Sequence, residues 1–304
     1  MEAADRGAVF VGLSTLDLSY AVDRYPAEDT KTQADELFLG AGGPAANAAV
    51  TYAFLSGRAT GLVTALGKHP LTEPIRGDLE QYGVTAVDLT PDGDRQPPVS
   101  SIIVATGAAT RTIVSLDGSR MRVPFEGSAD GYLDDAAIVL VDAHYSAPAL
   151  RLAEAARAAG IPVLLDAGRW RDVHAELLPL VDIAICSAAF TPPGVQADSI
   201  DAIFDFLHAA GPRLAAITRG ADPIAYSMPG ERGEVSIGGG AAVDTLGAGD
   251  ILHGAFCHFH SRGEAFPLAL EHAAEVATLS CRYVGTREWM RHYESQPKGS
   301  QSIR

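Results

Sequence analysis

The sequence DTLGAGDILHGAF, at residues 244–256, joins a glycine-rich segment directly to the start of a helix. Small residues at Gly254 and Ala255 suit the packing face of that helix. Glycines before a helix leave backbone N–H groups free to point at an oxyanion, and the helix dipole favours negative charge at the same place. The segment therefore predicts an anion hole formed by the backbone of residues 247–249.

Asp250 falls in the first turn of this predicted helix. A carboxylate there stabilises the helix dipole, and this structural role alone would explain the residue. A carboxylate beside a phosphate cradle is also where a general base must lie to take a proton from an attacking hydroxyl group. Both interpretations stay open from this segment alone.

A second glycine-rich loop, GAGGPAANAAV at residues 40–50, matches the G-x-G-x-x-A pattern of dinucleotide-binding oxidoreductases. Its context does not fit them. Their pattern closes the first strand and precedes an acid for the ribose by about 20 residues. Here an earlier strand pattern comes first, and no Asp or Glu lies between Ala45 and Thr72. Glycines let a ligand approach the backbone, and the Asn47 amide offers hydroxyl groups a donor and an acceptor. A plain glycine turn that caps a helix is the structural alternative.

Strand and helix patterns alternate from Ala137 onward. Repeated βαβ units build a mostly parallel sheet with helices on both faces, and ligands bind beyond the carboxyl ends of the strands. We expect helices at 45–56, 147–159, 173–180, 200–210, 248–262 and 267–283. The β-rich segments at about 14–40 and 95–120 break the alternation, so they predict a small separate sheet inserted as a lid into one domain.

The composition is that of a soluble globular protein, because 47% of the 304 residues are hydrophobic and 20% are charged. The net charge of −15 provides no broad basic face, which argues against nucleic acid as a partner. Three widely spaced cysteines fit a reducing compartment better than a disulfide framework. No apolar run approaches the roughly 18 residues of a membrane span, and the first residues lack a signal-peptide pattern. We therefore expect a cytoplasmic protein that does not bind membranes.

The two glycine-rich loops together resemble the two signature regions of the ribokinase-like, or phosphofructokinase B, family of carbohydrate kinases. The resemblance extends over nearly the whole chain. VGLSTLDL, at residues 11–18, resembles the family's first strand and its substrate-binding Asp, which is Asp17 here. RTIVSLDGS, from Arg111, is most similar to ketohexokinase and sulfofructose kinase members.

The resemblance implies a ribokinase-like α/β fold. Its form is a three-layer α/β/α sandwich with a mostly parallel central sheet and a small β-sheet lid, in a single domain over residues 1–294. In many members the lid also forms the dimer interface, so the resemblance implies a homodimer. We expect residues 295–304, SQPKGSQSIR, to be a flexible tail.

The activity implied by the resemblance is transfer of the γ-phosphoryl group of ATP to a hydroxymethyl group on a ketose or furanose-type sugar. Asp250 would be the general base. Backbone N–H groups of three residues would stabilise the transferred phosphoryl group: Gly247, Ala248 and Gly249. Four residues would hold the sugar hydroxyls: Asp17, Gly42, Gly43 and Asn47.

The resemblance also implies cofactor sites. The nucleotide would lie near a strand that ends in T-x-G, which matches Thr218, Arg219 and Gly220, and against Gly247 and Gly249. Asp244 and Thr245 match a loop in which several relatives bind a monovalent cation, so potassium would bind there. Magnesium would be held mainly by ATP phosphates and water, which this ion accepts readily.

Three departures from the family pattern bear on that expectation. The N-x-x-E motif, associated with magnesium, is replaced by the residues from Ser187 to Phe190. The common G-D-D segment reads Gly67-Lys68-His69, and Asp222-Pro223 stands where a small residue is usual.

Other side chains have less specific signals. Arg111, Lys31 and Arg169 could meet an anionic group on the substrate, and we place Arg111 in the substrate site. Four residues follow Asp250 on the predicted helix: His253, Cys257, His258 and His260. Only His253 and Cys257 share a helix face, so this spacing is unfavourable for a transition metal.

The sequence thus favours an ATP-dependent sugar kinase that binds a small-molecule sugar. Two alternatives remain: a nucleoside kinase on the same fold, and a catalytically weak sugar- or nucleotide-binding regulatory protein. The absence of the N-x-x-E acid is the feature that keeps the second alternative open.

Overall fold

The computed structural model describes residues 6–58, 60–116, 121–129, 131–196 and 199–293. The tail expected at 295–304 and the end of RTIVSLDGS lie outside these residues. Within them, no helix is both long and apolar enough to cross a membrane.

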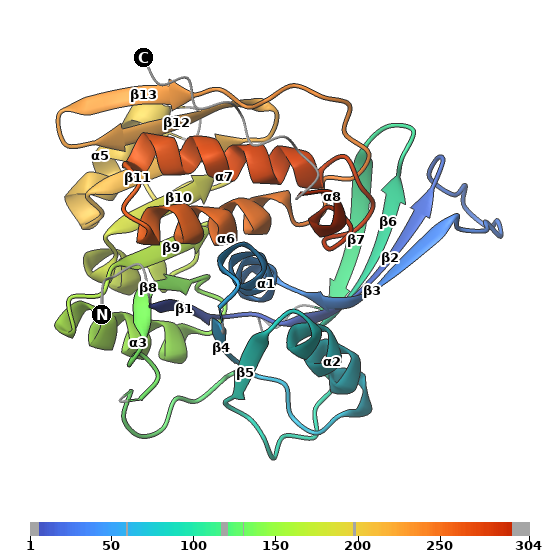
Figure 1. Cartoon of the computed structure of the whole chain (residues 1–304), viewed down its shortest axis with the longest axis horizontal. Helices are drawn as coiled ribbons and strands as arrows, with labels where there is room; N and C mark the ends of the chain where they lie inside the picture. Colours follow the sequence, from blue (N-terminus) through green and yellow to red (C-terminus); the bar gives the residue numbers. More distant parts are fainter. Residues whose placement is uncertain (1–5, 59, 117–120, 130, 197–198, 294–304) are drawn as a thin grey trace.

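A nine-stranded sheet forms the centre of the molecule, in the order β13-β12-β11-β10-β9-β8-β1-β4-β5 (Figure 1). Its strands are β1 Gly7–Val11, β4 Thr60–Thr64, β5 Val84–Asp88, β8 Ala136–Val141, β9 Val163–Ala167, β10 Ile183–Ser187, β11 Leu214–Arg219, β12 Asp222–Met228 and β13 Glu231–Val235. The strands from β11 to β5 are parallel, and β12 and β13 form an antiparallel hairpin at one edge.

Helices cover both faces of this sheet (Figure 1). One layer holds α1 Pro44–Ser56, α6 Ala248–Ser261 and α7 Phe266–Ser280; the other holds α3 Ser146–Ala158, α4 His174–Leu177 and α5 Ile200–Ala210. Strand β1 shows why both layers are needed. Phe10 belongs to the core under α1 and α6, whereas Val9 and Val11 belong to the core under α3. Because successive side chains of a strand point to opposite faces, a continuous apolar run needs cover on both sides. The expected three-layer α/β/α fold is confirmed.

The lid is a second sheet of four strands that projects from the body (Figure 1). Its order is β3-β2-β6-β7, with β2 Thr15–Val22, β3 Glu36–Gly42, β6 Val99–Ala105 and β7 Thr110–Leu116. Helix α2 Glu73–Gln81 packs between β5 and the base of β3, and the short helix α8 Met290–Tyr293 follows α7. Both lid segments therefore fold as one sheet, which opens toward the carboxyl ends of the central strands.

Candidate active site

The anion loop, residues 247–249 at the start of α6, begins with a backbone conformation that only glycine adopts easily. Gly247 is the N-cap of α6 with φ 68°, and a Cβ there would lie 2.7 Å from Cγ2 of Thr286. Gly249, in contrast, is exposed, and a Cβ on it would meet no protein atom within 4 Å. The first turn of α6, where helix N–H groups lack intrahelical partners, therefore borders open space at Gly249, while the N–H of Ala248 donates to the carbonyl oxygen of Thr245 over 3.4 Å.

Asp250 lies in that first turn, and one of its carboxylate oxygens is already held. The Nδ2 group of Asn47, on α1, donates to Oδ2 of Asp250 over 2.8 Å. The other oxygen, Oδ1, accepts no hydrogen bond from any described residue. Burial raises the pKa of Asp250 above its ordinary value, and the Asn47 hydrogen bond and the nearby His253 oppose that rise. One oxygen is thus free to accept a proton.

Asp17 approaches the same region from the lid. It is 5% exposed, and its Oδ1 accepts a 2.6 Å hydrogen bond from Oγ1 of Thr15. Burial raises the pKa of Asp17, and the hydrogen bonds from Thr15 and Ser100 oppose this effect. A Cβ on Gly42 would lie 2.0 Å from the Asp17 carboxylate, so only glycine leaves room for Asp17 to reach past β3.

Gly43 is required for a different reason. It has φ 94°, and a Cβ on it would lie 2.4 Å from the carbonyl oxygen of Leu13. The next residue, Pro44, begins α1, and the buried carboxylate of Asp142 accepts a hydrogen bond from the N–H of Ala45 over 3.3 Å. The G-x-G-x-x-A pattern thus lets the backbone at Gly43 pass close to the backbone of Leu13. It then leads into α1, whose first turn is capped by Asp142.

A cavity of about 200 Å³ lies at the carboxyl ends of β8, β9, β10 and β11, against Asp250. Thr218 and Gly249 line it, and Arg169 and Arg171 from the loop after β9 form part of its wall. Asp166 also faces it. Burial raises the pKa of Asp166 to about 7, and the attraction of His253 opposes this rise. Asp142, Asp166 and Arg171 carry no motif of their own, so nothing in the sequence marks them as site residues.

A second cavity of about 370 Å³ continues from the anion loop between α6, α7 and residues 237–242. Its wall is mostly apolar or glycine, from Gly220, Ile224, Leu252, Ala274 and similar residues. Thr218 and Gly249 line both cavities, so the two spaces meet at the anion loop. An apolar slot of this size that ends at an anion site suits a nucleotide whose base lies in the slot.

The side chains of two predicted site residues, Arg219 and Arg111, both have partners within the protein. Arg219 turns away from the cavities: its Nε donates to the carbonyl oxygen of Pro223 over 2.9 Å, and its Nη2 pairs with Glu234 over 2.7 Å. Arg111 reaches from β7 to the Thr245 hydroxyl and lines the apolar cavity. The Arg219 side chain therefore holds the β12–β13 edge, and the Arg111 side chain lies at the apolar cavity. Lys31 is exposed and lines neither cavity.

The loop expected to hold a monovalent cation is already committed to other partners. Oδ1 of Asp244 accepts the N–H of Leu246 over 2.8 Å, and Oδ2 accepts the N–H of Gly285 over 2.9 Å. The guanidinium of Arg111 is bonded to Thr245. The Asp244 carboxylate therefore ties the backbone of Leu246 to that of Gly285, and each of its oxygens accepts one of these hydrogen bonds.

The histidines after Asp250 do not converge on a common point. His253 contacts the carbonyl oxygens of Gly249 and Ile185 at 2.7 and 3.1 Å, whereas His260 stacks on Phe256. Among the residues that the structure describes, no three His, Cys, Asp or Glu side chains are grouped so that they could hold a metal ion. Ser187 replaces the first residue of the absent N-x-x-E motif, and Phe190 is buried against Trp170 and His174. Magnesium held largely by phosphate and water is compatible with these residues.

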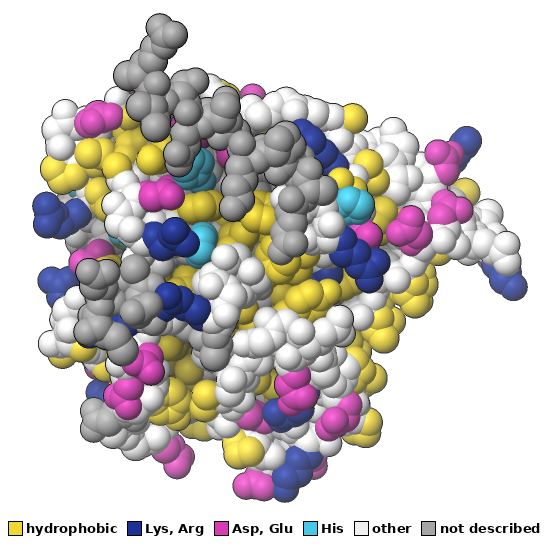
Figure 2. Space-filling view, viewed as in Figure 1, with side chains coloured by type: hydrophobic (Ala, Val, Ile, Leu, Met, Phe, Trp, Pro, Cys, Tyr) yellow, Lys and Arg dark blue, Asp and Glu magenta, His cyan; other side chains and the backbone are white. Residues whose placement is uncertain are grey.

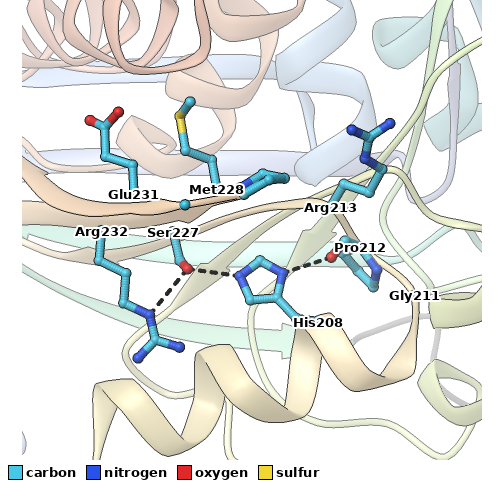
Figure 3. Close-up of a pocket in the computed structure, with 10 residues that line it drawn as sticks. His208, Gly211, Pro212, Arg213, Ser227, Met228, Glu231 and Arg232 are labelled. Carbon is cyan, nitrogen blue, oxygen red and sulfur yellow. Dashed lines mark hydrogen bonds between the residues drawn. The ribbon is translucent and has the colours of Figure 1, made fainter.

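A cavity of about 540 Å³ at the β12–β13 edge is unrelated to these groups (Figure 3). His208, Ser227 and Arg232 form a hydrogen-bonded chain there, and Nδ1 of His208 contacts the carbonyl oxygen of Pro212 at 2.9 Å. This cavity lies at the amino end of β11. Because ligands of such sheets bind at the carboxyl ends of the strands, it is not the active site.

Comparison with known proteins agrees with this geometry. Residues 5–292 match the model of the pfkB family of carbohydrate kinases. A ribokinase of Arabidopsis thaliana is 26% identical over 290 residues, which cover 91% of this chain and 76% of the relative.

Solved structures show the same fold. A candidate ribokinase from Agrobacterium tumefaciens superposes with a TM-score of 0.82 at 24% identity, over 96% of this chain and 99% of that one. The Arabidopsis thaliana ribokinase, solved with ribose and ATP, gives 0.74 at 24% identity, over 92% and 94%. The chain therefore belongs to the pfkB family and is a carbohydrate kinase.

Proposed function

We propose that this protein transfers the γ-phosphoryl group of ATP to a hydroxymethyl group of a ketose or furanose-type sugar. The observation that carries the proposal is Asp250, which has one oxygen held by Asn47 and one free, and which lines the smaller cavity next to Gly249, where the two cavities meet. The free Asp250 oxygen takes the proton of the sugar hydroxyl group. The hydroxyl oxygen then forms a bond to the γ-phosphorus of ATP as the bond from that phosphorus to ADP breaks, so ADP is the leaving group.

The sugar lies between the lid and α1. Asp17 accepts hydrogen bonds from its hydroxyl groups, and the backbone at Gly42 and Gly43 permits close approach. The Asn47 amide has two N–H groups, of which one is donated to Asp250 and the other remains for the sugar. Asp17 and Asp250 interact electrostatically, so a substrate that separates them with hydroxyl donors relieves their mutual repulsion.

The triphosphate crosses the anion loop, where N–H groups of Gly247, Ala248 and Gly249 face the transferred phosphoryl group. The base of ATP occupies the apolar cavity beside Gly220, and Thr218 and Arg111 flank the phosphates. Magnesium held by the phosphates would neutralise part of their charge. Arg169 and Arg171 supply further positive charge from the wall of the small cavity.

The test is ADP release from magnesium ATP across a panel of fructose, ribose, sulfofructose, fructose phosphates, 2-keto-3-deoxygluconate and adenosine. Sugar-dependent ADP release supports the proposal. Release with adenosine alone would identify a nucleoside kinase, and tight sugar or nucleotide binding by calorimetry without ADP release would identify a regulatory binding protein.

Gly42→Ala should weaken sugar use selectively. The added Cβ would lie 2.0 Å from the Asp17 carboxylate and must displace it. We expect kcat/KM for the sugar to fall by about tenfold to a hundredfold, roughly the worth of one or two hydrogen bonds to a charged group, while KM for ATP changes little. Equal losses for sugar and ATP would show that Gly42 does not act through Asp17.

We further propose that the lid forms a homodimer through its outer face. Strand pairing places five exposed apolar side chains on that face: Tyr20, Leu37, Leu39, Val114 and Leu116. Hydrophobic side chains are visible along the β3 edge of the projecting sheet (Figure 2). Contiguous exposed apolar surface of this kind is typical of an interface.

Leu39→Glu combined with Val114→Glu should therefore convert the protein to monomers. Light scattering at micromolar concentration should give twice the chain mass for the unmodified protein and the chain mass for the variant. Leu268→Glu, on the exposed side of α7, is the matched control and should leave the dimer intact. A monomeric unmodified protein would contradict the proposal.

A further inference from the structure

Arg287 is a buried arginine that follows α7 and belongs to neither glycine-rich loop. It is 7% exposed. Its Nη1 donates to Oδ1 of Asn47 over 3.0 Å, and its Nη2 donates to the carbonyl oxygen of Ala41 over 2.8 Å and to Oδ2 of Asp78 over 2.9 Å. The rings of Phe38 and Tyr82 lie 5.8 and 5.4 Å from its Cζ. One guanidinium group thus connects the C-terminal part of the chain to β3, α1 and α2.

The contact with Asn47 determines which way the amide points. A guanidinium has only donors, so the atom of Asn47 that faces Arg287 must be the carbonyl oxygen. The amide nitrogen then faces Asp250, to which it donates over 2.8 Å. Among the described residues, only Arg287 donates to Oδ1 of Asn47, so without it the orientation of the amide depends on Asp250 alone.

We propose that Arg287 is a positioning residue for the catalytic base: it locks the Asn47 amide so that Oδ2 of Asp250 is held and Oδ1 remains for the substrate. The same guanidinium holds the carbonyl of Ala41, the residue before Gly42. The Arg287 guanidinium therefore holds both Asn47, which contacts the base, and the backbone next to Gly42. The inference rests on the proposed function only in calling Asp250 the base.

The other charges around Asp250 come from five elements. They are Asp17 on β2, Arg111 on β7, Asp142 after β8, Asp166 on β9 and His253 on α6. Burial raises the pKa of Asp250, and the hydrogen bond from Asn47 is the first of the effects that oppose the rise. Loss of the oriented amide should therefore raise that pKa further, whereas a purely structural arginine would not affect it.

This difference can be measured without substrate. Because the pKa of Asp250 is raised in the fold, its carboxyl group stabilises the protein fully only below the pKa of the unfolded chain. That contribution falls as the pH rises and levels off above the folded-state pKa. The free energy of unfolding of the unmodified protein minus that of Asp250→Asn, followed against pH, therefore reports the pKa of Asp250 in the fold.

The variants must avoid leaving the Asp78 carboxylate without a partner, because an uncompensated buried charge can prevent folding. Asp78→Asn is the matched background: it removes the carboxylate, while the Arg287 guanidinium keeps its hydrogen bonds to Asn47, Ala41 and Thr286. Arg287→Met is then added to it. Arg287→Lys, which keeps a charge for Asp78, is the second choice if the double variant does not fold.

In the Asp78→Asn background, adding Arg287→Met should move the levelling-off point upward by about one pH unit, the worth of a hydrogen bond to a carboxylate. Asn47→Ala should produce a similar shift, and combining it with Arg287→Met should add nothing. An equal loss of stability at every pH, with no shift, would make Arg287 purely structural and overturn the proposal. If Arg287→Met still moved the levelling-off point by the full amount when Asn47→Ala was present, Arg287 would act on Asp250 by direct charge attraction. That result would also overturn the proposal.

The outcome is independent of the proposed function, because no step of the measurement requires phosphoryl transfer. Failure of the proposed function would appear instead as an absence of sugar-dependent ADP release in the unmodified protein.

Discussion

Asp250→Asn is expected to lower kcat by about a hundredfold to ten-thousandfold, which is the usual contribution of a general base. The amide keeps the shape of the side chain but cannot accept the hydroxyl proton. Its folding should be intact, because the pKa of Asp250 is raised by burial and a neutral group at this place avoids burying a charge. The measurement is ADP release at saturating sugar and ATP, together with the melting temperature.

Asp134→Asn is the matched control for this change. Asp134 is exposed and lies just before the amino end of β8, whereas Asp250 lies at the carboxyl ends of the strands. It should retain the full rate. If Asp250→Asn also retained kcat within a factor of two, Asp250 would have only the structural role at the helix N-terminus.

Gly249→Ala should lower kcat/KM for ATP by about a hundredfold or more, comparable to the loss of one oxyanion-hole donor. The added methyl group would meet no protein atom within 4 Å, so it would project into the space that the phosphoryl group needs. Helix propensity rises when alanine replaces glycine, by up to about 1 kcal/mol, so the variant should be at least as stable.

Gly77→Ala provides the control for that prediction. Gly77 is an exposed glycine inside α2, and a Cβ on it also meets no protein atom within 4 Å. It should gain the same helix propensity and lose no activity. A Gly249→Ala protein with unchanged kinetics would exclude the anion loop from phosphoryl binding.

Local patterns predicted the fold well where one element follows directly from its own residues. The apolar runs of β8 to β11 and the helices between them are recognisable from their own residues, and the glycine loops carry their conformation in their sequence. Three parts of the fold were not predicted from the sequence: α2, β5 and the β12–β13 hairpin. Helix α2 contains Gly77 and is largely polar, and β12 and β13 carry Arg, Glu and Asp at an edge where only one face needs to be apolar.

The candidate site shows the same division. Asp250 and the anion loop could be predicted, because a helix N-terminus builds the site from consecutive residues. The direction of the Arg219 and Arg111 side chains could not be predicted, because each depends on a partner, Glu234 or Thr245, that only tertiary structure brings near. Arg287 gave no signal at all: it lies 240 residues from Asn47 along the chain.

The central claim is that phosphate is transferred to a hydroxymethyl group. The most direct test is the proton-coupled phosphorus NMR spectrum of the product formed from magnesium ATP and an accepted sugar. A phosphorus signal split into a triplet by the two protons of a CH₂–O–P ester is the result we predict, with no such signal from Asp250→Asn. A doublet from a CH–O–P ester, or only the singlet of inorganic phosphate, would contradict the account.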